Sequence, residues 1–147
     1  MSHPGNDAIT IDTIIHAPIE AVWEAWTNPA IILNWFGSDP GGTGVKARMD
    51  VHPGGSFEIT FRDSDETQHT CYGVYTVVEV FSQLAFTWEW KSEPGVESLV
   101  TVLLVSEGNQ TRMHFGHAHL GAASKHNYLS GWQSTFVKLE NMLKGIA

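Results

Sequence analysis

A single long amphipathic helix is predicted at the end of the chain, from about Ser124 to Gly145. Its apolar stripe repeats at intervals of three and four residues and consists of Leu129, Trp132, Phe136, Leu139, Leu143 and Ile146. At 1.5 Å per residue this helix would be about 31–33 Å long, enough to cross a small domain. Gly131 lies inside it, which indicates either a close approach of another backbone or space left empty beside the helix.

Alternating apolar and polar residues predict strands through most of the remaining chain. One strand covers Ile9 to Ile15, two short helices follow at 18–27 and onward to Trp35, and six further strands come after them. The glycine-rich segment 37–44 is expected to be a mobile loop. The first of the six strands is expected to place one alternating set on its dry face: Val45, Ala47, Met49 and Val51.

This order of elements indicates an α+β fold with an antiparallel sheet. A helix about 10 Å wide cannot cover seven strands spaced about 4.8 Å apart. We therefore expect a curved seven-stranded antiparallel sheet wrapped round the long C-terminal helix, with two short helices after strand one. Core side chains or a cavity would fill the remaining space. The 147 residues suit a single domain, 1–147, with an ordered core of about 8–145.

Charge and cysteine content exclude several classes of partner. The formal net charge is −8, and the eight Lys and Arg residues are scattered, so no cationic face for nucleic acid is expected. No apolar stretch approaches the roughly 18 residues of a membrane span, and no signal peptide is recognisable, so a cytoplasmic location is expected. The one cysteine, Cys71, is interpreted as a small buried hydrophobic residue.

The segments that carry a family resemblance are HAPIEAVWEAWTNP, NWFG, VHPGGSF, GVYTVV, LAFTWEW and GWQSTFVKLENML. Their order and spacing resemble the START-like, birch-pollen-allergen-like superfamily, and within it the group named after the activator of the heat-shock protein ATPase. The resemblance runs from about Ile9 to Leu143. It implies a helix-grip fold with a pocket between sheet and helix. Because members include hydrophobic-ligand carriers, polyketide cyclases and co-chaperones, it implies the fold more sharply than the function.

Aromatic residues on the dry faces of the strands and helix are the predicted ligand site. We expect a small hydrophobic or aromatic molecule to be bound there, with the glycine-rich loop and the second short helix controlling access. The predicted ligand-binding residues are Trp35, Phe57, Phe61, Phe86, Trp88, Met113, Phe115, His117, Trp132 and Phe136. His117 would either be a polar handle for the ligand or a core histidine with its hydrogen bonds satisfied.

Metal binding and catalysis are weaker interpretations of the same residues. His117 and His119 share a predicted strand face, but no third ligand stands at suitable spacing, so neither a metal nor a cofactor is expected. A cyclase or hydrolase would need an acid or base close to the substrate, which would be His117 with Tyr72 or Glu89. Alternation turns Glu89 toward solvent, so binding without catalysis is favoured.

A protein-interaction function is the third interpretation. Thr101, Leu103 and Val105 make the outer face of one predicted strand partly apolar. Such a face could support a homodimer or the docking of a chaperone partner.

Overall fold

The structure, a computed structural model, describes residues 8–120 and 125–144. The expectations for Ile146 and for the two ends of the chain lie outside the described residues. The elements are β1 (Ile9–Ile15), α1 (Ile19–Thr27), α2 (Pro29–Ile32), β2 (Thr43–Met49), β3 (Ser56–Arg62), β4 (Gln68–Glu79), β5 (Gln83–Trp90), β6 (Ser98–Glu107), β7 (Gln110–Ala118) and α3 (Lys125–Lys144).

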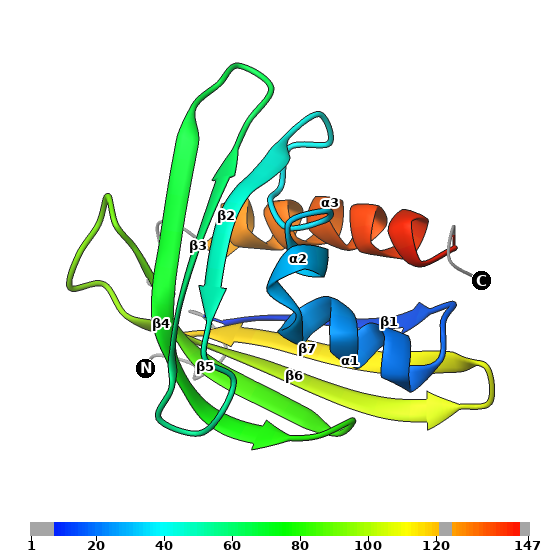
Figure 1. The fold of residues 1–147 in the computed structure, drawn as a ribbon. Coiled ribbons are helices and arrows are strands. Elements are labelled where there is room, and N and C mark those ends of the chain that lie inside the picture. The colour runs from blue at the N-terminus through cyan, green and yellow to red at the C-terminus, as the bar shows by residue number, and fades with distance from the viewer. Residues whose placement is uncertain (1–7, 121–124, 145–147) are drawn as a thin grey trace.

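The seven strands form one antiparallel sheet in the order β1-β7-β6-β5-β4-β3-β2. Figure 1 shows the sheet curving strongly, with α3 running across its concave side and α1 and α2 lying nearby. The predicted α+β architecture is therefore confirmed. None of the helices in the described ranges is both long and apolar enough to cross a membrane.

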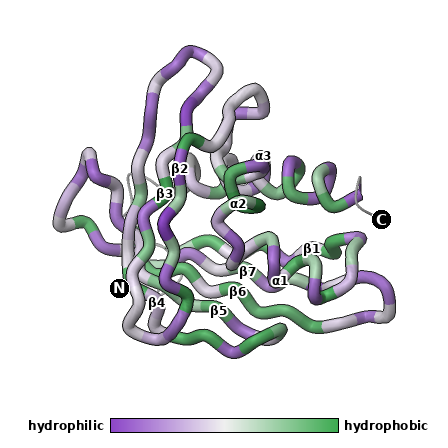
Figure 2. The backbone as a smooth tube through the Cα atoms, viewed as in Figure 1, coloured by the Kyte–Doolittle hydropathy of each residue, from purple (hydrophilic) through white to green (hydrophobic). Residues whose placement is uncertain are grey.

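The core lies between the concave face of the sheet and α3. The apolar stripe of α3 is buried as predicted at Trp132, Phe136, Leu139 and Leu143. Hydrophobic residues in Figure 2 recur along the body of the sheet and the helices, whereas the β3–β4 turn is mainly hydrophilic. This pattern follows from alternation, because every second strand residue meets the helix side.

The two short helices are joined by a tight connection that fixes the segment after them. Pro18 precedes α1, where its missing N–H leaves no donor unsatisfied. The side chain of Asn28 accepts a hydrogen bond from the Ala30 N–H and begins α2. Trp35 Nε1 then donates to the Ala25 carbonyl oxygen at 3.0 Å. This buried bond holds the chain in place where it leaves α2.

Two positions differ from simple alternation. Val45 was expected on the dry face of its strand, but it is 40% exposed because the register of β2 against β3 shifts between Gly44 and Lys46. The expected strand face of His117 and His119 is also wrong, because β7 ends at Ala118 and His119 has φ +63°. That left-handed conformation takes His119 out of the strand.

Gly73 allows β4 and β5 to approach closely where the sheet curves. A Cβ atom at this position would overlap the Thr87 carbonyl oxygen of β5. The register between the two strands shifts just beyond it, between Tyr75 and Val77. A strand glycine of this kind marks a close backbone approach rather than a flexible point.

We predict that Gly73→Ala lowers the free energy of unfolding by about 1–3 kcal/mol, because the backbone of one strand must move. The matched control is Gly116→Ala in β7, where the nearest heavy atom to a new Cβ is the Ile9 carbonyl oxygen at 3.9 Å. Measured by urea unfolding, the free energy of unfolding of the control should lie within about 1 kcal/mol of that of the unaltered protein. Equal losses in the two variants would contradict this reading of Gly73.

Candidate functional site

A cleft of about 290 Å³ lies between the concave face of the sheet and the N-terminal half of α3. Six aromatic side chains form most of its wall: Phe36, Phe61, Trp88, Trp90, Tyr128 and Trp132. Its polar lining comes from Ser38, His69, Glu93 and Thr135. We call this space the ring-walled cleft.

The aromatic walls of the ring-walled cleft stand at steep angles to one another. The planes of Trp88 and Trp90 are 89° apart with ring centres at 5.2 Å. Phe36 meets Trp132 at 82° and 5.8 Å, and Phe61 meets Trp90 at 61° and 6.0 Å. These are the edge-to-face contacts that aromatic pairs favour. They give a guest molecule several aromatic walls in different orientations.

Tyr128 supplies a polar group at the helix side of the cleft. Its hydroxyl accepts a hydrogen bond from Trp90 Nε1 at 2.6 Å. Burial raises the pKa of Tyr128, and the indole N–H groups of Trp90 and Trp88 act in the opposite direction. Trp88 Nε1 itself is buried without a well-formed hydrogen bond in the part of the chain that the structure describes. The Tyr128 hydroxyl accepts from Trp90 and keeps its own proton for donation to an acceptor atom on a guest.

Gly131 explains why the cleft stays open beside α3. It lies one turn after Tyr128 on the helix and lines the cleft. A Cβ atom at this position would lie 3.4 Å from the Cβ of Ser38 on the opposite wall. The sequence left open whether Gly131 allows another backbone to approach or leaves space beside the helix. The structure shows space beside the helix, with the Ser38 side chain across it.

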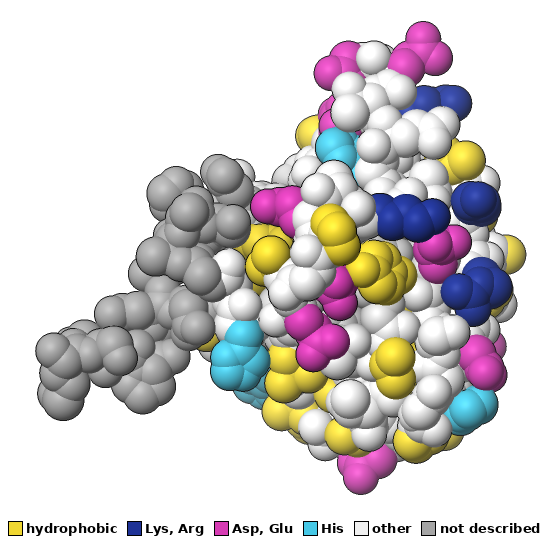
Figure 3. Space-filling model, turned by 90° about the vertical axis from the view of Figure 1, so that its left-hand side faces the viewer, with side chains coloured by type: hydrophobic (Ala, Val, Ile, Leu, Met, Phe, Trp, Pro, Cys, Tyr) yellow, Lys and Arg dark blue, Asp and Glu magenta, His cyan; other side chains and the backbone are white. Residues whose placement is uncertain are grey.

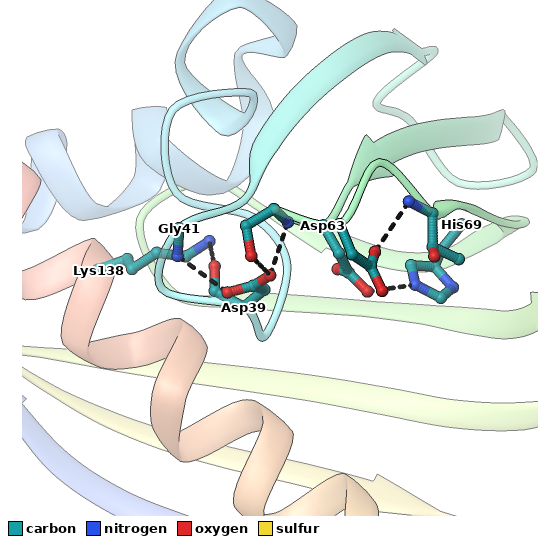
Figure 4. Close-up of polar contacts among 8 residues, drawn as sticks. Asp39, Gly41, Asp63, His69 and Lys138 are labelled. Carbon is teal, nitrogen blue, oxygen red and sulfur yellow. Dashed lines mark hydrogen bonds and ion pairs between the residues drawn. The ribbon is translucent and has the colours of Figure 1, made fainter.

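The loop between α2 and β2 forms one wall and is held from two sides (Figure 4). From α3, Ser134 Oγ donates to the Ser38 carbonyl oxygen at 2.6 Å and Lys138 Nζ donates to the Asp39 carbonyl oxygen at 3.0 Å. From the β3–β4 turn, the N–H and hydroxyl of Ser64 donate to the Asp39 carboxylate at 2.7 and 2.8 Å. Whether this loop opens to admit a ligand stays a prediction.

The pKa values of Asp39 and Lys138 are both shifted by their surroundings at this loop. The backbone N–H groups of Ser64 and Gly41 hold the pKa of Asp39 below its usual value. Partial burial lowers the pKa of Lys138, while the charges of Asp39 and Asp63 oppose that effect. The ammonium group of Lys138 is directed at the loop through its bond to the Asp39 carbonyl oxygen, and it does not line the cleft.

His69 reaches the cleft from β4. Its Nε2 lies 2.8 Å from the Asp63 carboxylate, as the right-hand part of Figure 4 shows. Its ring also packs against Phe61 and Trp90, with ring centres 5.5 and 6.1 Å away. The carboxylate holds the imidazole in one orientation at the cleft wall.

His117 is fully buried behind the cleft, with both ring nitrogens hydrogen-bonded inside the protein. Trp132 Nε1 donates to His117 Nδ1 at 3.0 Å, so Nδ1 is an acceptor and the proton is assigned to Nε2. Nε2 then donates to Ser98 Oγ at 2.7 Å, and Ser98 donates to the Trp88 carbonyl oxygen at 3.2 Å. This arrangement matches the core-histidine alternative and leaves no ring nitrogen for a ligand.

The structure places only three of the ten predicted ligand-binding residues on the cleft wall: Phe61, Trp88 and Trp132. The other seven lie deeper in the packed core, namely Trp35, Phe57, Phe86, Met113, Phe115, His117 and Phe136. They share the expected dry side, but neighbouring rings fill the space around them. Phe115, for example, lies 4.6 Å from Trp132 and 5.0 Å from Phe136, measured between ring centres. Whether any of the ten contacts a ligand stays a prediction.

The structure does not bring Tyr72 or Glu89, the residues considered for catalysis, to His117. The Tyr72 hydroxyl donates to the Glu89 carboxylate at 2.8 Å, away from the cleft lining. The Gly95 N–H binds the same carboxylate and, as the larger cause, lowers its pKa. Glu89 thus holds the turn between β5 and β6, and neither residue reaches His117.

No group of His, Cys, Asp and Glu side chains suited to hold a metal ion occurs among the residues described. Cys71 is completely buried, and burial raises the pKa of its thiol, which disfavours the reactive thiolate. This agrees with its interpretation as a small hydrophobic residue.

Several cleft residues were missed by reasoning from the sequence, including Phe36, Ser38, His69, Glu93 and Tyr128. Helical spacing could have found Tyr128, because it stands four residues before Trp132 and so shares its face. Strand alternation, which places Trp90 on the face of Trp88, could also have found His69, because it shares a face with Cys71. Nothing in the pattern places the loop residues or Glu93, because turns carry no such period.

Comparison with known proteins gives the family and the fold. The family model described as Activator of Hsp90 ATPase homolog 1-like protein matches residues 16–144. A solved protein of Nitrosomonas europaea is similar at 20% identity and a TM-score of 0.82, with 95% of this chain and 96% of that chain covered. None of the curated proteins matches this chain.

Two further solved structures share the fold. An AHSA1-like protein of Aeromonas hydrophila is 23% identical, with a TM-score of 0.80 over 95% of this chain and 93% of that chain. CalU16 of Micromonospora echinospora is also 23% identical, with a TM-score of 0.69 over 92% of this chain and 75% of that chain. At these identities the similarity establishes a common fold.

Burial of His117 predicts a specific loss of stability in acid. Burial lowers its pKa from 6.5 to about 3. Below about pH 6.5 the unfolded chain takes up a proton at this residue, whereas the folded protein takes it up only near pH 3. The unfolded state therefore binds more protons in this interval, and the free energy of unfolding falls as pH decreases through it.

We predict that His117→Gln, whose amide can still accept from Trp132 and donate to Ser98, removes up to about 1.4 kcal/mol per pH unit of this slope. Urea unfolding at a series of pH values measures it. His114→Gln, at a partly exposed histidine of the same strand, is the control and should retain the His117 contribution. An unchanged slope in His117→Gln would contradict the assignment.

Proposed function

The chain belongs to the family described as Activator of Hsp90 ATPase homolog 1-like proteins, and on that premise we propose that it binds a small hydrophobic or aromatic molecule. The observation that carries the proposal is the ring-walled cleft, a concave space of about 290 Å³ bordered mainly by aromatic side chains. This is close to the lower end of small-molecule sites, roughly 300–1,000 Å³.

Magnitudes favour a ligand with more than one apolar group. A single aromatic ring buries roughly 150–250 Å², which corresponds to about 4–6 kcal/mol at about 25 cal/mol per Å². Association alone costs about 4–15 kcal/mol in lost translational and rotational freedom. One ring therefore barely offsets this cost, whereas two rings, or one ring with a well-placed polar group, can exceed it.

The polar groups of this site would be Tyr128 and His69 in place of His117. Tyr128 stands where two indole N–H groups converge, and His69 is oriented by Asp63. A cyclase or hydrolase function in the same cleft would have to rely on His69 as its base. Binding without catalysis remains the favoured function, since aromatic side chains form most of the cleft wall.

A protein-interaction function is favoured by one separate observation. Leu103 is 40% and Val105 is 50% exposed along β6, on the side of the sheet away from α3. A second copy of the chain or a chaperone partner would dock on this face. The homodimer is tested by measuring the mass of the protein in solution at micromolar concentration. A monomeric mass would argue against it.

The ligand-binding proposal is tested with N-phenyl-1-naphthylamine, a neutral probe that fluoresces in apolar surroundings. We expect saturable binding, accompanied by quenching of tryptophan emission because Trp88, Trp90 and Trp132 line the cleft. Gly131→Leu should weaken binding at least about tenfold, since its side chain would occupy the space facing Ser38.

The control is Ser130→Leu, which adds the same side chain at the neighbouring exposed position of α3. It should bind the probe as the unaltered protein does. Equal affinities of the folded Gly131→Leu variant and the control would place the probe elsewhere and overturn the proposal.

A further inference from the structure

The permanently charged side chain that lines the ring-walled cleft is negative. Glu93, an exposed residue of the turn between β5 and β6, lines the cleft, and no Lys or Arg does so among the residues described. The turn itself is held by the bond from the Gly95 N–H to Glu89. The face of the molecule that carries this turn appears in Figure 3, where acidic side chains stand among hydrophobic ones in the middle.

Three cationic or imidazole groups of the described residues, Lys138, Lys91 and His69, are each bound to another group of the protein. Lys138 binds the loop carbonyl of Asp39. Lys91 forms an ion pair with Glu58 at 3.2 Å. His69 faces the cleft but is bound to the Asp63 carboxylate, which adds a second negative charge behind the wall. An anionic guest would therefore meet repulsion, with no Lys or Arg to compensate it among the described residues of the wall, whereas a cation would meet attraction.

The walls of the cleft favour the same sign of charge. The face of an aromatic ring is the negative part of its quadrupole and attracts a cation, with Trp the strongest of the side chains. Three Trp rings line this cleft, and Trp88 stands at 89° to Trp90. A compact cation between such walls would contact more than one ring.

Resting on the ligand-binding function proposed above, we propose that the cleft selects a cationic guest, a compact apolar or aromatic molecule carrying a protonated amine or a quaternary ammonium group. The ring-walled cleft holds the apolar body and the cation, and Glu93 supplies the countercharge at the rim. A long-chain carboxylate or another organic anion would be rejected by the same lining.

Three small molecules of matched size test the sign of the charge. Phenyltrimethylammonium is the cation, tert-butylbenzene is its neutral isostere, and benzoate is the anion. Each is titrated directly against the protein by tryptophan fluorescence. We expect phenyltrimethylammonium to bind about tenfold more tightly than tert-butylbenzene, which reflects a partly desolvated cation–π contact, and benzoate to bind most weakly.

Glu93→Gln separates the carboxylate from the rings. It should weaken binding of the cation about twofold to fivefold, as expected of a partly exposed ion pair, and leave binding of tert-butylbenzene unchanged. Glu97→Gln removes the same charge from the same connection, at an exposed position outside the cleft lining, and should change neither. Added salt should weaken binding of phenyltrimethylammonium to the unaltered protein more than its binding to Glu93→Gln.

The outcomes distinguish charge selection from ligand binding as such. If tert-butylbenzene or benzoate binds as tightly as the cation, selection by charge is wrong although the cleft still binds ligands. Equal effects of Glu93→Gln and Glu97→Gln on the cation would also overturn the role of Glu93. If neither these three compounds nor N-phenyl-1-naphthylamine binds the folded protein, the binding function fails together with its charge preference.

Discussion

The hydrogen-bonded chain through His117 joins the helix to the sheet. It runs from Trp132 on α3 to His117 on β7, then to Ser98 on β6 and the backbone of Trp88 on β5. Each donor and acceptor in it is satisfied only when the imidazole is neutral, in agreement with the lowered pKa of His117. Removing one member would leave a buried polar group unpaired, at a cost of about 1–3 kcal/mol. Because Trp132 and Trp88 also line the ring-walled cleft, the same chain fixes its inner wall.

The width of the sheet explains why the cleft lies beside one half of α3. Toward its C-terminal end the helix buries Leu139 and Leu143, which fill the space against the sheet. Toward its N-terminal end, Gly131 offers no side chain and the opposing surface consists of large rings. A helix about 10 Å wide covers only part of a seven-stranded sheet, and the uncovered part is closed by the segment after α2.

Periodic patterns predicted the elements and the buried faces, but not the space between them. The stripe on α3 and the alternation in β5 placed Trp132 and Trp88 correctly on the inner side. The same patterns could not separate the packed Phe115 from the cleft-lining Phe61, because burial depends on neighbours from distant segments. Val45 was misplaced because a register shift breaks the two-residue period. The ties from Ser64 and Lys138 to Asp39 join three separate segments, and local spacing carries no signal of such contacts.

The walls of the ring-walled cleft are held in place by hydrogen bonds within the protein. The rings of Trp132 and Trp90 are fixed by their own hydrogen bonds, to His117 and Tyr128, and the loop wall is fixed from both α3 and the β3–β4 turn. Walls that are already ordered lose little conformational entropy on binding, so more of the contact energy appears as affinity. Under the proposed function, selectivity would depend on these aromatic surfaces and on the Glu93 carboxylate, and less on closure of the loop.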